Sequence, residues 1–276
     1  PLKDAPLDWD VITSQASGKV SNLIASSALD IGRRRENNED ALLCLSGVLG
    51  SQNDGNPLGI YVIADGMGGH RNGEIASEIA VRALGAHLVG KLYKPMFGPE
   101  PNPTEESLRE IMETAVHVAH TAVKRAAPGG GCTLTAALMV GAQVVIAHLG
   151  DSRAYAIARN GKIESLTKDH SLVKRLQEMG QLTAEEAATH PQKSVLYRAL
   201  GQGEAAQADI FSATLPNPGY LMICSDGLWG VVDEDEMERI VNSAASPYLA
   251  CQQLVEAANA AGGPDNISVI LARLVN

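Results

Sequence analysis

The stretch Gly59–Gly69 reads Gly-Ile-Tyr-Val-Ile-Ala-Asp-Gly-Met-Gly-Gly. Its apolar half, Ile60–Ala64, is typical of a buried strand, and this run ends on a carboxylate, Asp65, and a glycine-rich turn. Burying a carboxylate is costly unless a positive group meets it. The stretch therefore predicts a buried strand that delivers one carboxylate to a functional site.

Three more carboxylates stand next to apolar runs: Asp151 after 144–149, Asp226 after 220–224, and Asp265 just before 267–274. A single Asp-Gly pair is more simply a turn. Four such junctions in one chain, with Glu39-Asp40 upstream, favour carboxylates that converge on metal ions. Oxygen ligands suit Mg²⁺ or Mn²⁺, whereas zinc would require His and Cys.

Two glycines, Gly66 and Gly227, directly follow two of these carboxylates. Because glycine has no Cβ, we expect the backbone to turn sharply after each Asp. Such a turn could also expose a carbonyl oxygen as a further metal ligand. The sequence thus predicts a site built from side chains and backbone together.

A run of three arginines, Arg33-Arg34-Arg35, precedes Glu39-Asp40 in a chain that is otherwise acidic. For the first two, a solvated turn is the simpler interpretation. A guanidinium beside a metal cluster, however, suits the capture of two phosphate oxygens. The residues alone thus indicate metal-assisted attack of water on a phosphoryl group, with an arginine that holds the substrate.

The composition restricts the class of protein. The chain has 276 residues, a net charge of −10 and 45% hydrophobic residues, enough for one large domain with its own core. An acidic excess argues against general nucleic-acid binding, and no run approaches the ~20 apolar residues of a membrane span. No secretory signal opens the chain, and the four cysteines are far apart without a Cys-x-x-Cys. We therefore expect a cytoplasmic protein that binds neither nucleic acid nor membrane.

Runs of strands and paired helices, without regular βαβ alternation, predict an α+β fold with antiparallel sheets. Expected strands cover 26–31, 41–45, 58–64, 133–140, 144–149, 153–158, 162–166, 208–213, 220–224 and 267–274, with those from 133 to 158 successive antiparallel neighbours. Expected helices cover 74–92, 104–126 (with Thr104 as N-cap), 170–180, 183–189, 234–243 and 247–260. Residues 1–20 are expected to form a loosely attached extension to a single domain, 21–276. The segment 170–203 has weak core character and is expected to be an insertion or flap over the site.

Six motifs occur in a fixed order, namely Arg35-Glu36-Asn37-Asn38-Glu39-Asp40, Asp65-Gly66-Met67-Gly68-Gly69-His70, Gly131-Cys132-Thr133-Leu134-Thr135, Gly150-Asp151-Ser152-Arg153, Ser225-Asp226-Gly227-Leu228-Trp229 and Asp265-Asn266-Ile267-Ser268. Together they resemble the metal-dependent Ser/Thr protein phosphatases of type 2C, and specifically the bacterial branch. The resemblance covers roughly residues 22–275. It implies a sandwich of two antiparallel β-sheets flanked by pairs of antiparallel helices.

The resemblance implies two main metal sites, for Mn²⁺ or Mg²⁺. Asp65 would bridge both metal ions, and Asp226 and Asp265 would complete the first site. Glu39 and the Gly66 carbonyl would belong to the second site. A water or hydroxide that bridges the two metals would then attack phosphorus in line, without a covalent phosphoenzyme.

The resemblance also implies supporting roles. Asp40 would orient metal-bound water, Asp151 with Asp226 would form a weaker third site, and Arg35 would bind the phosphate. Met67 stands where animal members have a His suited to protonating the leaving alkoxide, so metal-bound water could serve instead. Cys132 stands where the family usually has Ser or Thr, and its expected role is packing.

Three functions remain open at this point. The first is an active, monomeric phosphatase for phosphoserine and phosphothreonine in proteins, whose substrates a Ser/Thr kinase supplies. The second is a catalytically weak regulatory or binding module of the same fold, and the third is a hydrolase of small phosphoesters. Every expected metal carboxylate is present, which favours the first.

Overall fold

The computed structural model describes residues 22–50, 55–68, 71–94, 106–141, 143–159 and 161–275. The first sheet has the strand order β1 (Asn22–Asp30), β11 (Ile267–Val275), β10 (Gly219–Cys224), β7 (Arg153–Ala158) and β8 (Lys162–Ser165). The second has the order β2 (Asp40–Gly50), β3 (Gly55–Met67), β5 (Leu134–Val140), β6 (Gln143–Leu149) and β9 (Asp209–Ala213), with the short β4 (Gly131–Cys132) beside β3. The strand pairs are antiparallel, as expected.

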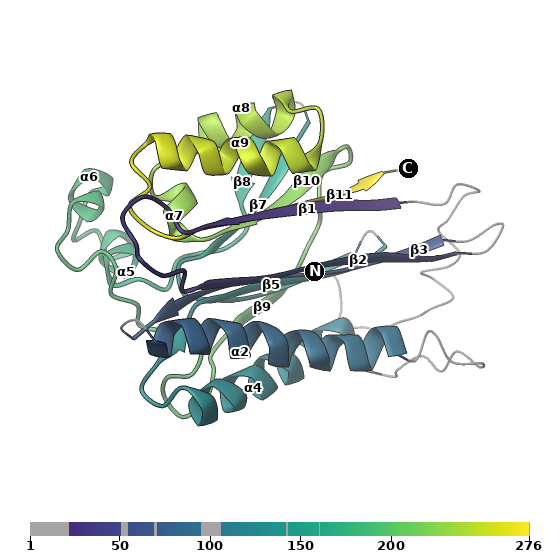
Figure 1. The fold of residues 1–276 in the computed structure, drawn as a ribbon, viewed down its shortest axis with the longest axis horizontal. Helices are drawn as coiled ribbons and strands as arrows, with labels where there is room; N and C mark the ends of the chain where they lie inside the picture. Colours follow the sequence, from purple (N-terminus) through teal and green to yellow (C-terminus); the bar gives the residue numbers. More distant parts are fainter. Residues whose placement is uncertain are drawn as a thin grey trace.

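Helices cover both outer faces of the stacked sheets (Figure 1). The second sheet is covered by α2 (Arg71–Leu88), which a π-helical turn, η1 (Val89–Tyr93), extends, and by α4 (Leu108–Ala126). The first is covered by α8 (Glu234–Ser243) and α9 (Pro247–Ala260). The shorter α5 (Leu172–Glu178), α6 (Ala184–Ala188) and α7 (Asp226–Trp229) lie at one end of the sandwich, on the left in Figure 1. The predicted α+β sandwich is confirmed, whereas the expected extension, 1–20, lies outside the described residues.

Strand β3 explains why the decisive stretch of sequence is apolar without interruption. Successive side chains of a strand point to opposite faces. Ile60 and Val62 pack in the layer between the second sheet and helices α2 and α4, while Tyr61 and Ile63 pack between the two sheets. All four are fully buried. Because both faces of the strand are covered, no polar residue is tolerated until the chain reaches the site.

Two strand predictions are wrong in part. β3 does not end before Asp65 but continues to Met67, because Gly66 pairs with Cys132 of β4. The strand at 153–158 does not follow β6 in the same sheet: β7 pairs with β10 and β8 in the first sheet. The chain passes between the sheets at 150–152, where Gly150 has a φ of +102° that favours glycine.

Helix α4 begins later than the sequence suggested. Its N-cap is Ser107, whose hydroxyl accepts a hydrogen bond from the Glu110 backbone N–H, while the Glu110 carboxylate accepts one from the Ser107 N–H. This reciprocal capping box fixes the start of the helix. Thr104, the predicted N-cap, lies outside the described residues.

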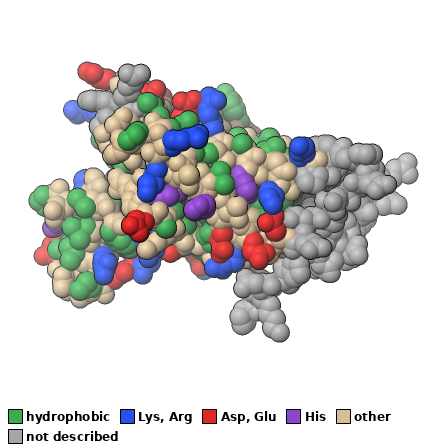
Figure 2. Space-filling view, turned by 90° about the horizontal axis from the view of Figure 1, so that it is seen from below, with side chains coloured by type: hydrophobic (Ala, Val, Ile, Leu, Met, Phe, Trp, Pro, Cys, Tyr) green, Lys and Arg blue, Asp and Glu red, His purple; other side chains and the backbone are tan. Residues whose placement is uncertain are grey.

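The face formed by α2 and α4 carries charges of both signs (Figure 2). Exposed side chains on α4 include Arg109, Glu113, His117 and Lys124. Acidic and basic groups are mixed on this face, which lacks the continuous basic surface that nucleic acid would need. Within the described ranges, none of the helices combines the length and apolar character that a membrane crossing requires.

Candidate metal centre

The predicted carboxylates come from both sheets and meet at one end of the sandwich. Asp40 opens β2 and lies opposite Asp65 of β3 in the strand pairing. Asp226 opens α7 directly after β10, and Asp265 stands just before β11. Strand ends and a helix start thus place four carboxylates, far apart in the sequence, in one region.

Electrostatics shows that these carboxylates act on one another. Burial raises the pKa of Asp65 well above its usual value, and repulsion from Asp40, Asp226, Asp151 and Asp265 raises it further. Burial and then repulsion from Asp226 raise the pKa of Asp151 to about 8. Burial and repulsion from Asp265 raise the pKa of Asp226 to about 6, although a hydrogen bond with Asp65 opposes the change. A cation among these groups would remove the penalty of charging them together.

Two buried carboxylate oxygens support a cation at this place. Among the described residues, Oδ1 of Asp40 and Oδ1 of Asp226 have no hydrogen-bond partner. Buried polar atoms without partners are uncommon, and oxygen-only donors are the ligands of Mg²⁺ and Mn²⁺. In the described part of the chain, however, no three His, Cys, Asp or Glu side chains already form a metal-binding group. The donors thus fit divalent cations by their chemistry.

Asp40 accepts hydrogen bonds from two hydroxyl groups, one in strand β11 and one directly after strand β10. It is 7% exposed, and its Oδ2 accepts hydrogen bonds from the Oγ atoms of Ser225, at 2.8 Å, and Ser268. Burial raises the pKa of Asp40 to about 7, although these hydrogen bonds oppose the change. One carboxylate oxygen is thus fixed, and the other remains available to a further partner.

Gly66 and Gly227 are required for close approach and not for the sharp turns that the sequence suggested. Neither has a positive φ. A Cβ on Gly66 would lie 2.3 Å from the Gly73 carbonyl oxygen, and a Cβ on Gly227 would lie 2.0 Å from that of Asn266. The Gly66 N–H donates to the Glu39 carbonyl at 3.0 Å. The backbones of the two residues predicted for the second metal site are therefore in contact.

Arg35 lies beside the carboxylates, as predicted. Its Nη2 donates to Oδ2 of Asp265 at 2.7 Å, and 51% of its side-chain surface is exposed. The hydrogen bond to Asp265 is the main cause that raises the pKa of Arg35. The guanidinium is thus anchored at the edge of the cluster and accessible to an anion from solvent.

Asn266 has a structural role that the sequence did not reveal. Its Nδ2 donates to the carbonyls of Ile31 and Asn37, and its Oδ1 accepts from the Glu39 N–H at 2.8 Å. One side chain therefore holds the loop that carries Arg35 and Glu39. In the sequence, this role was signalled by the position of Asn266 directly after Asp265 within a motif.

The segment 170–203, which the sequence predicts to be a flap, has a buried contact near its end. Leu200 and Cys132 exchange backbone hydrogen bonds of 3.1 and 2.8 Å, which places the end of the flap beside β4. Cys132 is fully buried, so its predicted packing role is confirmed. Met179 and Tyr197 are 61% and 45% exposed, which agrees with the weak core character of this segment.

Comparison with known proteins identifies the family. A family model of protein phosphatase 2C matches residues 32–260. This chain belongs to the protein phosphatase 2C family. It is 39% identical over 244 residues to the serine/threonine phosphatase Stp of Listeria welshimeri, which covers 88% of this chain and 92% of the relative.

Solved structures of bacterial and related serine/threonine phosphatases share the fold. The serine/threonine phosphatase of S. agalactiae superimposes with a TM-score of 0.76 and 32% identity, over 91% of this chain and 99% of the other. The catalytic domain of the phosphatase PstP, solved with two manganese ions, gives a TM-score of 0.74 and 30% identity, over 93% of this chain and 100% of the other. The family resemblance and the fold class expected from the six motifs are thereby confirmed.

Proposed function

We propose that this chain is a metal-dependent protein phosphatase that hydrolyses phosphoserine and phosphothreonine in proteins. The observation that carries the proposal is the carboxylate cluster, with the unpaired buried oxygens of Asp40 and Asp226. The similar protein from Listeria welshimeri is named a serine/threonine phosphatase, and a structural neighbour contains two manganese ions. Both comparisons support the same chemistry.

The chain would hold two to three divalent cations, Mn²⁺ or Mg²⁺. The proposed ligands are Asp65, Asp226 and Asp265 for the first cation, Asp65, Glu39 and the Gly66 carbonyl for the second, and Asp151 with Asp226 for a third. When bound, these cations would activate a water molecule and neutralise charge on the phosphoryl oxygens. Asp40, bound to Ser225 and Ser268, would orient that water.

The substrate phosphate would bind to Arg35. A guanidinium can donate two parallel hydrogen bonds to a phosphate, and this one is half exposed beside the carboxylates. Met67 carries no titratable proton, so protonation of the leaving serine or threonine oxygen falls to water. Positive charge at the edge of the site selects an anionic substrate and holds it next to the cations.

The biological setting is also part of the proposal. We place the protein in the cytoplasm, as a monomer that acts on proteins phosphorylated by a Ser/Thr kinase and binds neither nucleic acid nor membrane. Its four cysteines are free and three of them are buried, which supports a reducing compartment. Residues 21–276 would form one catalytic domain, in which the flap, 170–203, contributes to substrate choice.

The deciding experiment measures phosphate release from a phosphothreonine peptide while Mn²⁺ or Mg²⁺ is titrated against a chelated control. We expect release that requires metal, is lost in Asp226→Asn, and persists in Asp235→Asn, because Asp235 is exposed on α8. Metal binding by calorimetry without any release would contradict the proposal and favour a regulatory module. Faster turnover of small phosphate esters than of phosphopeptides would favour the phosphoester hydrolase instead.

A further inference from the structure

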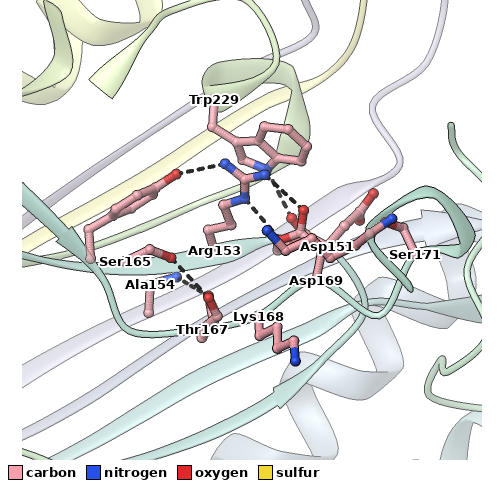
Figure 3. A network of polar contacts seen from close by, with 12 residues as sticks. Asp151, Arg153, Ala154, Ser165, Thr167, Lys168, Asp169, Ser171 and Trp229 are labelled. Carbon is pink, nitrogen blue, oxygen red and sulfur yellow. Dashed lines mark hydrogen bonds and ion pairs between the residues drawn. The ribbon is translucent and has the colours of Figure 1, made fainter. Parts of the chain in front are cut away.

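A polar network next to Asp151 connects three segments of the chain (Figure 3). Arg153 of β7 donates from Nε and Nη2 to the two carboxylate oxygens of Asp169, at 2.9 and 2.8 Å. Its guanidinium carbon lies 3.5 Å from the centroid of the Trp229 ring, and its Nη1 donates to the Tyr155 hydroxyl at 3.2 Å. The indole Nε1 of Trp229 donates to the Asp151 carbonyl at 2.9 Å.

The residues around Arg153 hold Asp151 from two sides. His170 is the first residue of the predicted flap, 170–203, and Asp169 directly precedes it. His170 binds Gly150 twice: the His170 N–H donates to the Gly150 carbonyl at 2.7 Å, and His170 Nδ1 accepts from the Gly150 N–H at 3.2 Å. Trp229 is the last residue of α7, the helix that Asp226 opens. The network therefore links the start of the flap, the Asp151 segment and the helix that carries Asp226.

The contacts of Arg153 fix the orientation of Asp169 and Trp229 relative to each other. Its side chain is 22% exposed and that of Asp169 is 8% exposed, so water competes little with this bidentate pair. A bidentate guanidinium fixes both the distance and the plane of its partner, and its flat face can stack on an indole at the same time. A lysine could supply the charge but neither of these constraints. Buried ion pairs add little stability on average, whereas they can fix the relative placement of segments.

We propose that Arg153 is a positioning residue: by contacting Asp169 and Trp229 together, it sets the placement of Asp151 relative to Asp226 that a third divalent cation requires. Arg153 acts through its neighbours and contacts neither phosphate nor cation. The same contacts couple the flap to this cation, because Asp169 directly precedes the flap. The inference rests on the proposed function, in which Asp151 and Asp226 share the third cation.

The test measures Mn²⁺ binding to the full chain by calorimetry. Arg153→Lys keeps the positive charge but loses the two parallel hydrogen bonds and the planar face. We expect the weakest Mn²⁺ to lose about tenfold or more in affinity, since residues that orient metal ligands have effects of this size, while the tighter cations bind within about twofold of the parent. The matched control is Arg239→Lys, which breaks a bidentate pair with Glu236 on the exposed face of α8 and is expected to change no Mn²⁺ affinity.

A second readout uses the fluorescence of Trp229. The chain has two tryptophans, so Trp9→Phe leaves Trp229 as the only one. In this background we expect the emission of Trp229 to change as Mn²⁺ is added, with its midpoint at the Mn²⁺ concentration that half-fills the weakest site. Arg153→Lys should shift this midpoint by the same factor by which it lowers the affinity measured by calorimetry. If circular dichroism shows that Arg153→Lys does not fold, Trp229→Phe decides by calorimetry, because it keeps a ring but removes the donor to the Asp151 carbonyl.

Three results would overturn the inference. The first is a parent protein that binds only two Mn²⁺ ions. The second is a folded Arg153→Lys variant that binds the weakest Mn²⁺ as tightly as the parent, and the third is an Arg153→Lys variant in which all Mn²⁺ affinities fall by the same factor. A lower melting temperature with unchanged Mn²⁺ binding would likewise assign Arg153 to stability alone. None of these readouts depends on turnover, so they are separable from a failure of the parent protein to release phosphate.

Discussion

Ser268 and Asp40 connect the two sheets at the end where the carboxylates gather. Ser268 lies in β11 of the first sheet, and its hydroxyl donates to Oδ2 of Asp40, the first residue of β2 in the second sheet. Ser225, which follows β10, donates to the same oxygen. One buried carboxylate thus belongs to both the sheet packing and the proposed metal centre.

Asp40→Asn should separate these two roles. The amide keeps the size of the side chain but loses the negative charge, so we expect Mn²⁺ affinity to fall by about 10- to 100-fold while the fold is retained. Phosphate release should fall at limiting Mn²⁺ and recover in part at saturating Mn²⁺. Calorimetry and a Mn²⁺ titration of activity measure this, with Asp235→Asn as control. Parent-like Mn²⁺ affinity would show that the Asp40 charge does not serve the metal centre.

Arg35→Ala should weaken substrate binding more than it slows the chemical step. If the guanidinium contacts the phosphate equally in the ground state and the transition state, its loss raises KM for a phosphopeptide more than it lowers kcat. Arg34→Ala is the matched control, since Arg34 is exposed in the same loop and is expected to leave both constants unchanged. Steady-state kinetics at saturating Mn²⁺ gives both constants. An unchanged KM in Arg35→Ala would remove this residue from the phosphate site.

The stability of the metal-free protein should fall as the pH rises. The pKa values of Asp226, Asp40 and Asp151 are raised to about 6, 7 and 8, chiefly by burial, from 3.8 for a free Asp. Between the ordinary pKa of 3.8 and each raised pKa, the folded state binds more protons than the unfolded state. The free energy of unfolding therefore decreases as the pH rises, by roughly 1.4 kcal/mol per unit of pKa shift. The opposite effect of His148, whose pKa burial lowers to about 4, is confined to pH below about 6.5.

Thermal unfolding from pH ~6.5 to ~8.0 in chelator therefore reports chiefly the carboxylates, because the buried cysteines, whose pKa values burial raises from 9.0, contribute mainly at higher pH. We expect the melting temperature to fall across this range in chelator and to fall less in saturating Mn²⁺, because the cation replaces the protons. A melting temperature that rises with pH in chelator would show that the carboxylates are not buried together. A variant with Asp226→Asn should show a weaker pH dependence than the parent in chelator.

Some elements could be predicted from the sequence because local signals set their limits. Helices α8 and α9 have the predicted bounds, since Asp233 and Ser246 cap their N-termini and Pro247 starts the second. The short helix α7 was not predicted, because four residues are too few for a helical period. The place of β7 was also wrong, because its partner β10 lies far along the chain and no local pattern specifies the pairing.

The carboxylates of the site were predictable for a physical reason, and the residues that hold them were not. A carboxylate such as Asp65 at the end of an apolar run can be recognised from a single sequence, because a buried strand is expected to carry apolar side chains. Ser225 and Asn266 act through hydrogen bonds to segments distant in sequence, so their roles emerge only when those segments are brought together. The same holds for Arg153, whose partner residues come from two other parts of the chain.

Gly227→Ala tests whether the close approach at the metal centre is essential. A Cβ at this position would lie 2.0 Å from the Asn266 carbonyl oxygen, so the backbone of Asn266 would have to move. Asn266 binds the Glu39 N–H, and a shift there would disturb the loop that carries Glu39. We expect a loss of about 1–3 kcal/mol in the free energy of unfolding, typical of an overpacked core, together with weaker Mn²⁺ binding.

Gly90→Ala is the matched control for that substitution. Gly90 lies in the π-helical turn that follows α2, has no positive φ, and has open space where a Cβ would stand. Alanine there restricts the unfolded chain without a steric cost, so we expect a gain of up to about 1 kcal/mol and unchanged Mn²⁺ binding. Chemical denaturation and calorimetry compare the two variants. If Gly227→Ala were as stable as Gly90→Ala and bound Mn²⁺ equally well, the contact between Gly227 and Asn266 would not be what holds Asp226 and Glu39 together at the site.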